Sequence, residues 1–170
     1  MREQFQLKPI SREAIPGAIQ KAERYRLLNE SRAAESICRD ILDIDPENQQ
    51  VLVILVLALT DQLAEGHATV MKGVKEILPR ITDPYQRLYY TGIASERSGQ
   101  AYLHRGGMGS GGMAYDALRQ AMEWYEKAEE IRPAGNDDSI LRWNTCARLI
   151  NTNSHVTAHT ESAYEPALED

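Results

Sequence analysis

The sequence predicts an all-α protein built from paired helices, and three observations support this prediction. Residues 113–131 carry small and apolar side chains at spacings of three and four, the period of an amphipathic helix, and Pro133 forbids its continuation. The same pattern occurs at residues 31–44, which Pro46 follows. The longest apolar run, residues 51–59, could be a buried strand, but it continues to Leu63 before Gly66 offers a stop; that length favours a helix.

The two patterned segments match position by position. Each matched pair is separated by 87 residues, so the match is one register and indicates an internal repeat. The pairs are Ala34 with Ala121, Cys38 with Tyr125, Ile41 with Ala128, Ile44 with Ile131 and Pro46 with Pro133.

The pattern Ala-x3-aromatic-x2-Ala, with a proline eight residues after the aromatic, resembles the second helix of a tetratricopeptide repeat (TPR). Ala22 and Tyr25 resemble the small-x2-Tyr of that family's first helix. Two repeats of about 34 residues account for about 68 of the 87 residues that separate the copies, so one further repeat fits between them. About 19 residues remain as an insertion, which we assign to the glycine-rich run. The resemblance implies a right-handed α-α superhelix of about three helical hairpins plus a C-terminal capping helix.

The resulting domain organisation has three parts. Residues 1–14 form a polar N-terminal arm, residues 15–151 a TPR-like helical domain, and residues 152–170 an acidic flexible tail without a periodic apolar pattern. Within the domain, the repeats are expected at about 15–48, 49–82 and 83–133, with the glycine-rich insertion at 105–112 and the capping helix at 137–151.

Individual residues predict several helix ends. Pro16 suits the first turn of a helix, and Asn29 suits the left-handed residue that ends one. Pro79 predicts a kink or an end near residues 76–78, and Asp83 before Pro84 predicts a capped start. The helix that contains residues 51–63 is apolar on all sides, so we expect it at the centre of the domain.

Composition and charge exclude several classes of function. A net charge of -6 and a sequence pI near 5.3, without a cluster of Lys and Arg, argue against nucleic acid as a partner. The N-terminus lacks a signal-peptide pattern and no apolar run is long enough to span a bilayer, so we expect no membrane association and a cytoplasmic location. In that compartment Cys38 and Cys146, each on an apolar helical face, are expected to be buried free thiols.

The candidate chemical motifs all have a plainer interpretation. Gly107, Gly109 and Gly112 match G-x-G-x-x-G, but no strand pattern precedes them, so a flexible loop between helices is favoured over a phosphate site. Together with Arg105, these glycines remain a possible binding loop, since long insertions often bind ligands. His155 and His159 have the spacing of helical metal ligands but lie in the predicted tail. No arrangement of catalytic residues stands out, so we predict a protein that is not an enzyme and needs no cofactor or metal.

The resemblance implies that a partner binds along the concave surface lined by the first helix of each repeat. Polar residues that fall outside the packing stripes of these helices are the predicted groove: Glu23, Arg26, Gln50, Asp61, Gln86, Glu96, Arg97, Asn144 and Arg148. A solvated face is the alternative for each. The chaperone-binding members of the family hold a terminal carboxylate with Lys and Asn. The corresponding residues here, Ile19, Glu23, Ile54, Gln86 and Tyr90, cannot do so, and that function is set aside.

The predicted function is therefore a non-catalytic scaffold that binds a protein or peptide partner. One alternative is a structural homo-oligomer that associates through the apolar helix at 51–63 or through Trp143. Another is a small-molecule or nucleotide-binding protein that uses the Gly107–Gly112 loop. Stability should distinguish a core residue from a groove residue. Tyr125→Ala is expected to cost about 3–5 kcal/mol of stability, whereas Arg97→Ala should change stability by less than about 0.5 kcal/mol.

Overall fold

The computed structural model describes residues 4–159, and within this range the chain is all-helical, with seven α-helices and no strand. Short 3-10 turns accompany three of the helices. The helices are α1 (Ile15–Leu27), α2 (Ser31–Ile44), α3 (Gln49–Thr60), α4 (His67–Ile77), α5 (Pro84–Arg105), α6 (Ser110–Glu130) and α7 (Asp138–Thr152). The all-α prediction is confirmed.

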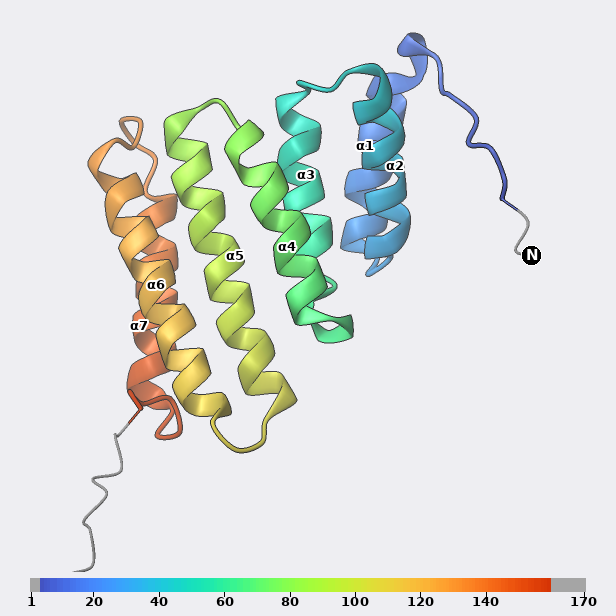
Figure 1. The fold of residues 1–170 in the computed structure, drawn as a ribbon. Helices are drawn as coiled ribbons and strands as arrows, with labels where there is room; N and C mark the ends of the chain where they lie inside the picture. The colour runs from blue at the N-terminus through green and yellow to red at the C-terminus, as the bar shows by residue number, and fades with distance from the viewer. Residues whose placement is uncertain (1–3, 160–170) are drawn as a thin grey trace, which may run out of the picture.

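Successive helices form antiparallel hairpins that stand side by side (Figure 1). The pairs α1/α2, α3/α4 and α5/α6 follow one another across the molecule, and α7 packs on α6 at the far side. This arrangement gives α1, α3 and α5 the same direction along the molecule. Their polar faces are therefore able to contribute to one surface.

Local sequence signals set the helix ends. Pro16 lies in the first turn of α1, and Asn29 adopts the left-handed conformation, with φ of 61°, in the turn before α2. The Asp83 side chain accepts a hydrogen bond from the backbone N–H of Gln86 at 2.7 Å and caps α5. At Pro79 the α-helical hydrogen bonding stops, so α4 ends at Ile77 and a 3-10 turn follows. These four predictions are confirmed.

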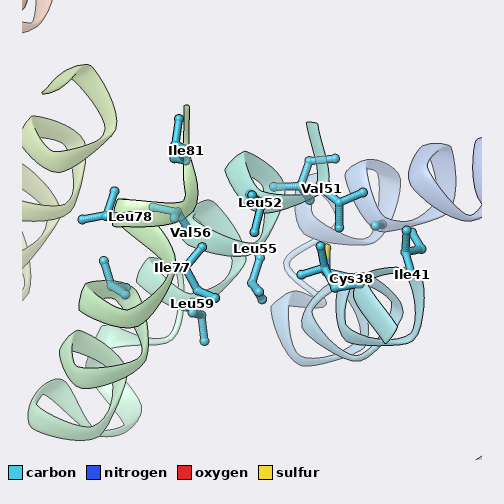
Figure 2. Close-up of a cluster of buried hydrophobic side chains, with 14 of the residues drawn as sticks. Cys38, Ile41, Val51, Leu52, Leu55, Val56, Leu59, Ile77, Leu78 and Ile81 are labelled. Atoms are coloured by element: carbon cyan, nitrogen blue, oxygen red, sulfur yellow. The ribbon is translucent and has the colours of Figure 1, made fainter. Parts of the chain in front are cut away.

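The core divides into two clusters of buried apolar side chains. The first joins helices α1 to α4, and α3 supplies more of it than any other helix. Figure 2 shows Leu52 and Leu55 of α3 among the side chains between the first hairpin and α4. The second cluster joins α5, α6 and α7 around Leu118 and Tyr125. Tyr90 packs against both clusters, and Leu57 of α3 packs against the second. The central position predicted for the apolar helix is therefore correct.

The glycine-rich insertion predicted at residues 105–112 does not exist as a loop of that length. The third hairpin is instead built from longer helices, with 22 residues in α5 and 21 in α6 against 13 in α1 and 14 in α2. Gly106, Gly107 and Gly109, which have positive φ, make the turn, and α6 already begins at Ser110. The additional residues therefore extend α5 and α6, because these two helices continue to pack on each other beyond the length of a typical repeat.

Two small residues of α5 explain why the longer helices pack so closely. A Cβ on Gly92 would lie 2.5 Å from the Tyr125 ring, and a Cβ on Gly99 would lie 2.9 Å from Leu118 Cγ. The two glycines are seven residues apart, as are the two side chains that face them, so one antiparallel register holds through the extension. A larger residue at either position would push α6 away from α5.

The prediction that a flexible tail begins at residue 152 places its start too early in the chain. Thr152 is the last residue of α7, and the next residues return to pack against the start of α6. Val156 is 2% exposed in the second core cluster, and the His155 carbonyl lies where a Cβ on Gly111 would stand. The remainder of the predicted tail, residues 160–170, lies outside the described residues.

Candidate functional site

A groove of about 500 Å³ runs between α1, α3 and α5. We call it the α1–α3–α5 groove and define it by its lining residues: Glu23, Arg26, Leu27, Gln49, Gln50, Val53, Ile54, Leu57, Gln86 and Tyr90. Four of the nine predicted groove residues, Glu23, Arg26, Gln50 and Gln86, are among them. Three successive first helices thus line one hollow.

The floor of the α1–α3–α5 groove is apolar. Val53 and Leu57 lie one turn apart on α3 and are partly exposed, although most of that helix is buried. Leu27 at the end of α1 is 74% exposed, and Tyr90 of α5 is partly buried against both core clusters. An apolar surface of this kind is suited to a side chain of similar character.

Three glutamines line the groove at the start of α3 and α5. Gln49 accepts a hydrogen bond from the Thr82 backbone N–H at 2.8 Å, which fixes the junction between α4 and α5. Gln50 donates to Glu23 Oε1 at 3.2 Å, which ties α3 to α1. Gln86 is exposed at the groove edge. Because a glutamine amide both donates and accepts, it is able to bind the backbone of an extended peptide.

An ion-pair network stands where α3 ends. Asp61 lies between two guanidinium groups, with Arg26 Nη1 at 3.3 Å and Arg97 Nη1 at 2.7 Å. Arg97 Nη1 also donates to the Leu57 carbonyl at 3.0 Å and to Thr60 Oγ1 at 2.7 Å. Arg97 therefore binds the C-terminal end of α3, where a positive charge also interacts favourably with the helix dipole.

This geometry corrects the expectation that Arg97 has no part in stability. Its side chain is only 22% exposed and joins the second hairpin to the third. Burial lowers the pKa of the Arg97 guanidinium, Asp61 opposes that shift, and Arg26 and Arg142 nearby lower the pKa further. Arg97 and Asp61 lie in a second hollow adjoining the groove, between the ends of α3 and α5.

Glu96 is not a groove residue, and that prediction is wrong. It is 1% exposed and accepts hydrogen bonds from Tyr125 Oη at 2.6 Å, Gln100 Nε2 at 3.1 Å and Arg142 Nη1 at 3.2 Å. A buried carboxylate needs such partners because its desolvation is costly. Glu96 therefore joins α5, α6 and α7 from inside the protein.

The two groove residues predicted on the last helix are placed elsewhere. Asn144 is partly exposed and Arg148 exposed on α7, and neither lines the α1–α3–α5 groove. The residues that the sequence reasoning missed are Leu27, Gln49, Val53 and Leu57. The sequence contained a signal for Val53 and Leu57. They are four residues apart on a helix that is apolar on all sides, and the neighbouring helices do not cover every side of it.

The glycine run has a structural explanation. Gly106, Gly107 and Gly109 turn the chain between α5 and α6, whereas Gly111 and Gly112 lie inside α6 beside the His155 carbonyl and the His159 ring. The expected loop around Gly112 is thus wrong, and Arg105 is the last residue of α5 with its guanidinium over the Tyr102 ring. Within residues 4–159 the strand that a dinucleotide fingerprint requires before its first glycine is absent.

His155 and His159 do not share a helix, because both follow the end of α7. His159 Nε2 lies 3.6 Å from Asp116 Oδ2 at the surface. No group of three or more potential metal ligands occurs among the described residues.

A serine and a histidine lie in contact, although no sequence motif indicated this pair. His67 Nε2 and Ser98 Oγ are 2.5 Å apart at the junction of α4 and α5, and the His67 ring packs against Tyr102. Burial lowers the pKa of His67, with Arg105 adding to the effect. Ser98 sits in the middle of α5, where helical hydrogen bonds occupy the backbone N–H groups, so the backbone beside Ser98 supplies no oxyanion-binding donor. The contact serves the packing of α4 on α5.

Both cysteines are buried and free, as expected. Burial raises the pKa of the Cys38 thiol to about 12 and that of the Cys146 thiol to about 12, so neither is a reactive nucleophile. None of the described helices combines the length and the apolar character needed to cross a membrane.

Comparison with protein family models, with curated proteins and with solved structures gave no match to this chain.

Proposed function

We propose that the chain is a TPR-like scaffold that binds a segment of a partner protein in the α1–α3–α5 groove. The fold supports this through the two hairpins that carry the 87-residue match: Ala34 and Ala121 are both fully buried, as are Cys38 and Tyr125. Matching residues therefore face inward in both hairpins, as they would in a repeat array. The finer assignment to a right-handed superhelix is part of this proposal.

The groove itself is the observation that carries the proposal. It combines an apolar floor at Val53, Ile54 and Leu57 with amide and charged groups at its edges. A bound segment would place an apolar side chain on the floor and its backbone against the Gln86 amide, the usual division between affinity and orientation in peptide recognition. Hydrogen bonds and ion pairs across α1, α3 and α5 hold this surface in place before any partner arrives.

The self-association alternative is less well supported. The apolar helix proposed for that role is α3, and most of its large side chains are buried in the first core cluster. Trp143, the other candidate, packs on the second core cluster, and its indole N–H donates to Glu126 at 2.9 Å. Leu141, 62% exposed on α7, is an apolar position away from the groove and serves as a control.

The test is selection of a random 12-residue peptide library on the immobilised protein. We expect enriched peptides to share a short pattern and to lose binding to Val53→Glu, which puts a charge on the groove floor, but to keep binding to Leu141→Glu, which makes the same kind of change on α7. Circular dichroism checks that both variants fold. The proposal fails if no peptide is enriched over the bare support, or if the selected peptides bind Val53→Glu as well as the parent protein.

A further inference from the structure

Arg26 of α1 lines the α1–α3–α5 groove and shares Asp61 with Arg97 of α5, which lines the hollow between the ends of α3 and α5; Arg142 of α7 is the third arginine of this network. Two carboxylates face them: Asp61, which Arg26 and Arg97 share, and Glu96, which pairs with Arg142. The three arginines therefore exceed the carboxylates they pair with by one positive charge. That local excess contrasts with the net charge of -6 for the whole chain.

The guanidinium groups have donors to spare. Arg26 bonds Asp61 through Nη1, and Arg97 makes all three of its hydrogen bonds through Nη1. Among residues 4–159, no acceptor takes up the Nε or Nη2 groups of these two side chains. Each side chain is 22% exposed, so these donors are partly withdrawn from water but still reachable. A carboxylate matches the geometry of such a planar set of donors.

The opposite end of the groove has the other sign. Glu23 lies one turn before Arg26 on α1, and its carboxylate is directed to Gln50 at the start of α3, whereas Arg26 reaches Asp61 at the end of α3. The apolar floor of Val53, Ile54 and Leu57 lies between these two contacts on the same helix. The groove therefore has an acidic end, an apolar middle and a basic end, which would fix the direction in which a segment binds.

From this charge pattern we infer that the partner segment carries an acidic side chain that binds Arg26 and Arg97, close in sequence to the apolar side chain that occupies the floor. This inference rests on the proposed function, since it names the chemistry of the segment held in the same groove. Of the possible occupants, an Asp- or Glu-containing protein segment fits both the free donors and the apolar floor. A basic segment would meet Arg26 and Arg97 at that end, and like-charge repulsion disfavours its binding there.

The first test uses the random 12-residue library on the full chain. We expect Asp or Glu to be enriched at a fixed distance from an apolar residue. A synthetic peptide of the selected sequence should bind roughly tenfold or more tightly than the same peptide with Asn or Gln in place of the acidic residue, as for one charge-assisted hydrogen-bonded pair. Selected peptides that depend on Val53 but show no acidic preference would overturn this inference and leave the proposed function standing.

The second test assigns the preference to its residue. In Arg26→Gln the difference between the acidic and the neutral peptide should shrink to a few-fold or less, whereas Arg24→Gln, an exposed arginine two positions away on α1, should keep it. An unchanged difference in Arg26→Gln overturns the inference. So does binding that appears only when the chain ends after His159, because the chain's own acidic residues, Glu161, Glu165 and Glu169, would then be the occupant.

Discussion

The first and third hairpins share one sequence pattern, yet they solve the packing problem differently. In the first, Cys38 fills the position between α1 and α2 with a small thiol, and the interface is apolar. In the third, Tyr125 fills the matching position in α6 and its hydroxyl bonds the buried carboxylate of Glu96. A repeat therefore determines which positions face inward, while the residue at each position decides whether the interior is apolar or polar.

The larger residue also explains the glycines of α5. Because Tyr125 occupies so much of the interface, α5 has Gly92 where the ring approaches, and Glu96 is one turn further along with its partners from α6 and α7. The third hairpin is thus specified by a few tightly coupled residues, and the first by ordinary apolar packing. Matched substitutions in the two hairpins should therefore change the free energy of unfolding by different amounts.

The largest difference is expected at the matched pair itself. Tyr125→Ala should lower the free energy of unfolding by about 3–5 kcal/mol, because it opens a cavity and removes a partner of buried Glu96. Cys38→Ala should cost about 1 kcal/mol, since only a small apolar group is lost. Tyr125→Phe, which keeps the ring, should fall between them. Chemical denaturation measures all three, and equal losses for Tyr125→Ala and Cys38→Ala would contradict the comparison.

Gly92 gives the next largest effect. Gly92→Ala should destabilise by about 1–3 kcal/mol, because the new methyl group would overlap the Tyr125 ring unless α6 moves. The control is Gly17→Ala in α1, where no atom lies within 4 Å of the added Cβ; it should stabilise by about 0.5–1 kcal/mol. Thermal unfolding measures both variants. If both substitutions changed stability in the same direction, α5 and α6 would not be as close at Gly92 as the structure shows.

Arg97 tests the junction that attaches the third hairpin to the second. Arg97→Ala should cost about 1–3 kcal/mol, because it removes the hydrogen bonds to the Leu57 carbonyl and Thr60 at the end of α3 and leaves Asp61 with Arg26 alone. Arg24→Ala, at an exposed position on α1, should change stability by less than about 0.5 kcal/mol. Urea denaturation distinguishes the two variants. If Arg97→Ala lost no more stability than Arg24→Ala within error, Arg97 would be a groove residue without a part in stability, as the sequence alone indicated.

The smallest effect concerns pH. His67 has a lowered pKa in the folded protein, so the folded state binds fewer protons than the unfolded state in the range between its two pKa values. The stability that depends on neutral His67 is therefore complete above the unfolded pKa, near 6.5, and is lost as pH falls through the folded pKa. His67→Gln should reduce this loss on going from pH 7 to pH 5, and His104→Gln, at an exposed position, should leave it unchanged. Denaturation at both pH values provides the measurement.

The sequence was most informative where a residue acts through its own backbone or its periodicity. Asn29, Pro79 and Asp83 determine helix ends locally, and the all-round apolar character of residues 51–59 places α3 at the centre. These features require no knowledge of distant residues. They were correctly predicted for that reason.

The errors arise where two distant segments decide the outcome together. Glu96 has the polarity of a surface residue, and only the approach of Tyr125 and Arg142 from other helices makes it an interior one. The glycine run looks like a loop, but Gly111 and Gly112 lie in α6 because residues 155–159 return against them. In the candidate site, Glu23, Arg26, Gln50 and Gln86 were found from helical position, whereas the floor at Val53 and Leu57 depends on how much of α3 its neighbours leave uncovered.

The most direct test of peptide binding in the α1–α3–α5 groove is to titrate a selected 12-residue peptide into isotope-labelled protein and to follow the backbone amide signals by NMR. We expect the largest shift changes to cluster on α1, α3 and α5, around Arg26, Val53 and Gln86. Shift changes concentrated instead at the Gly106–Gly109 turn, or on α4 and α6, would contradict it, because the segment would then bind a surface other than the α1–α3–α5 groove.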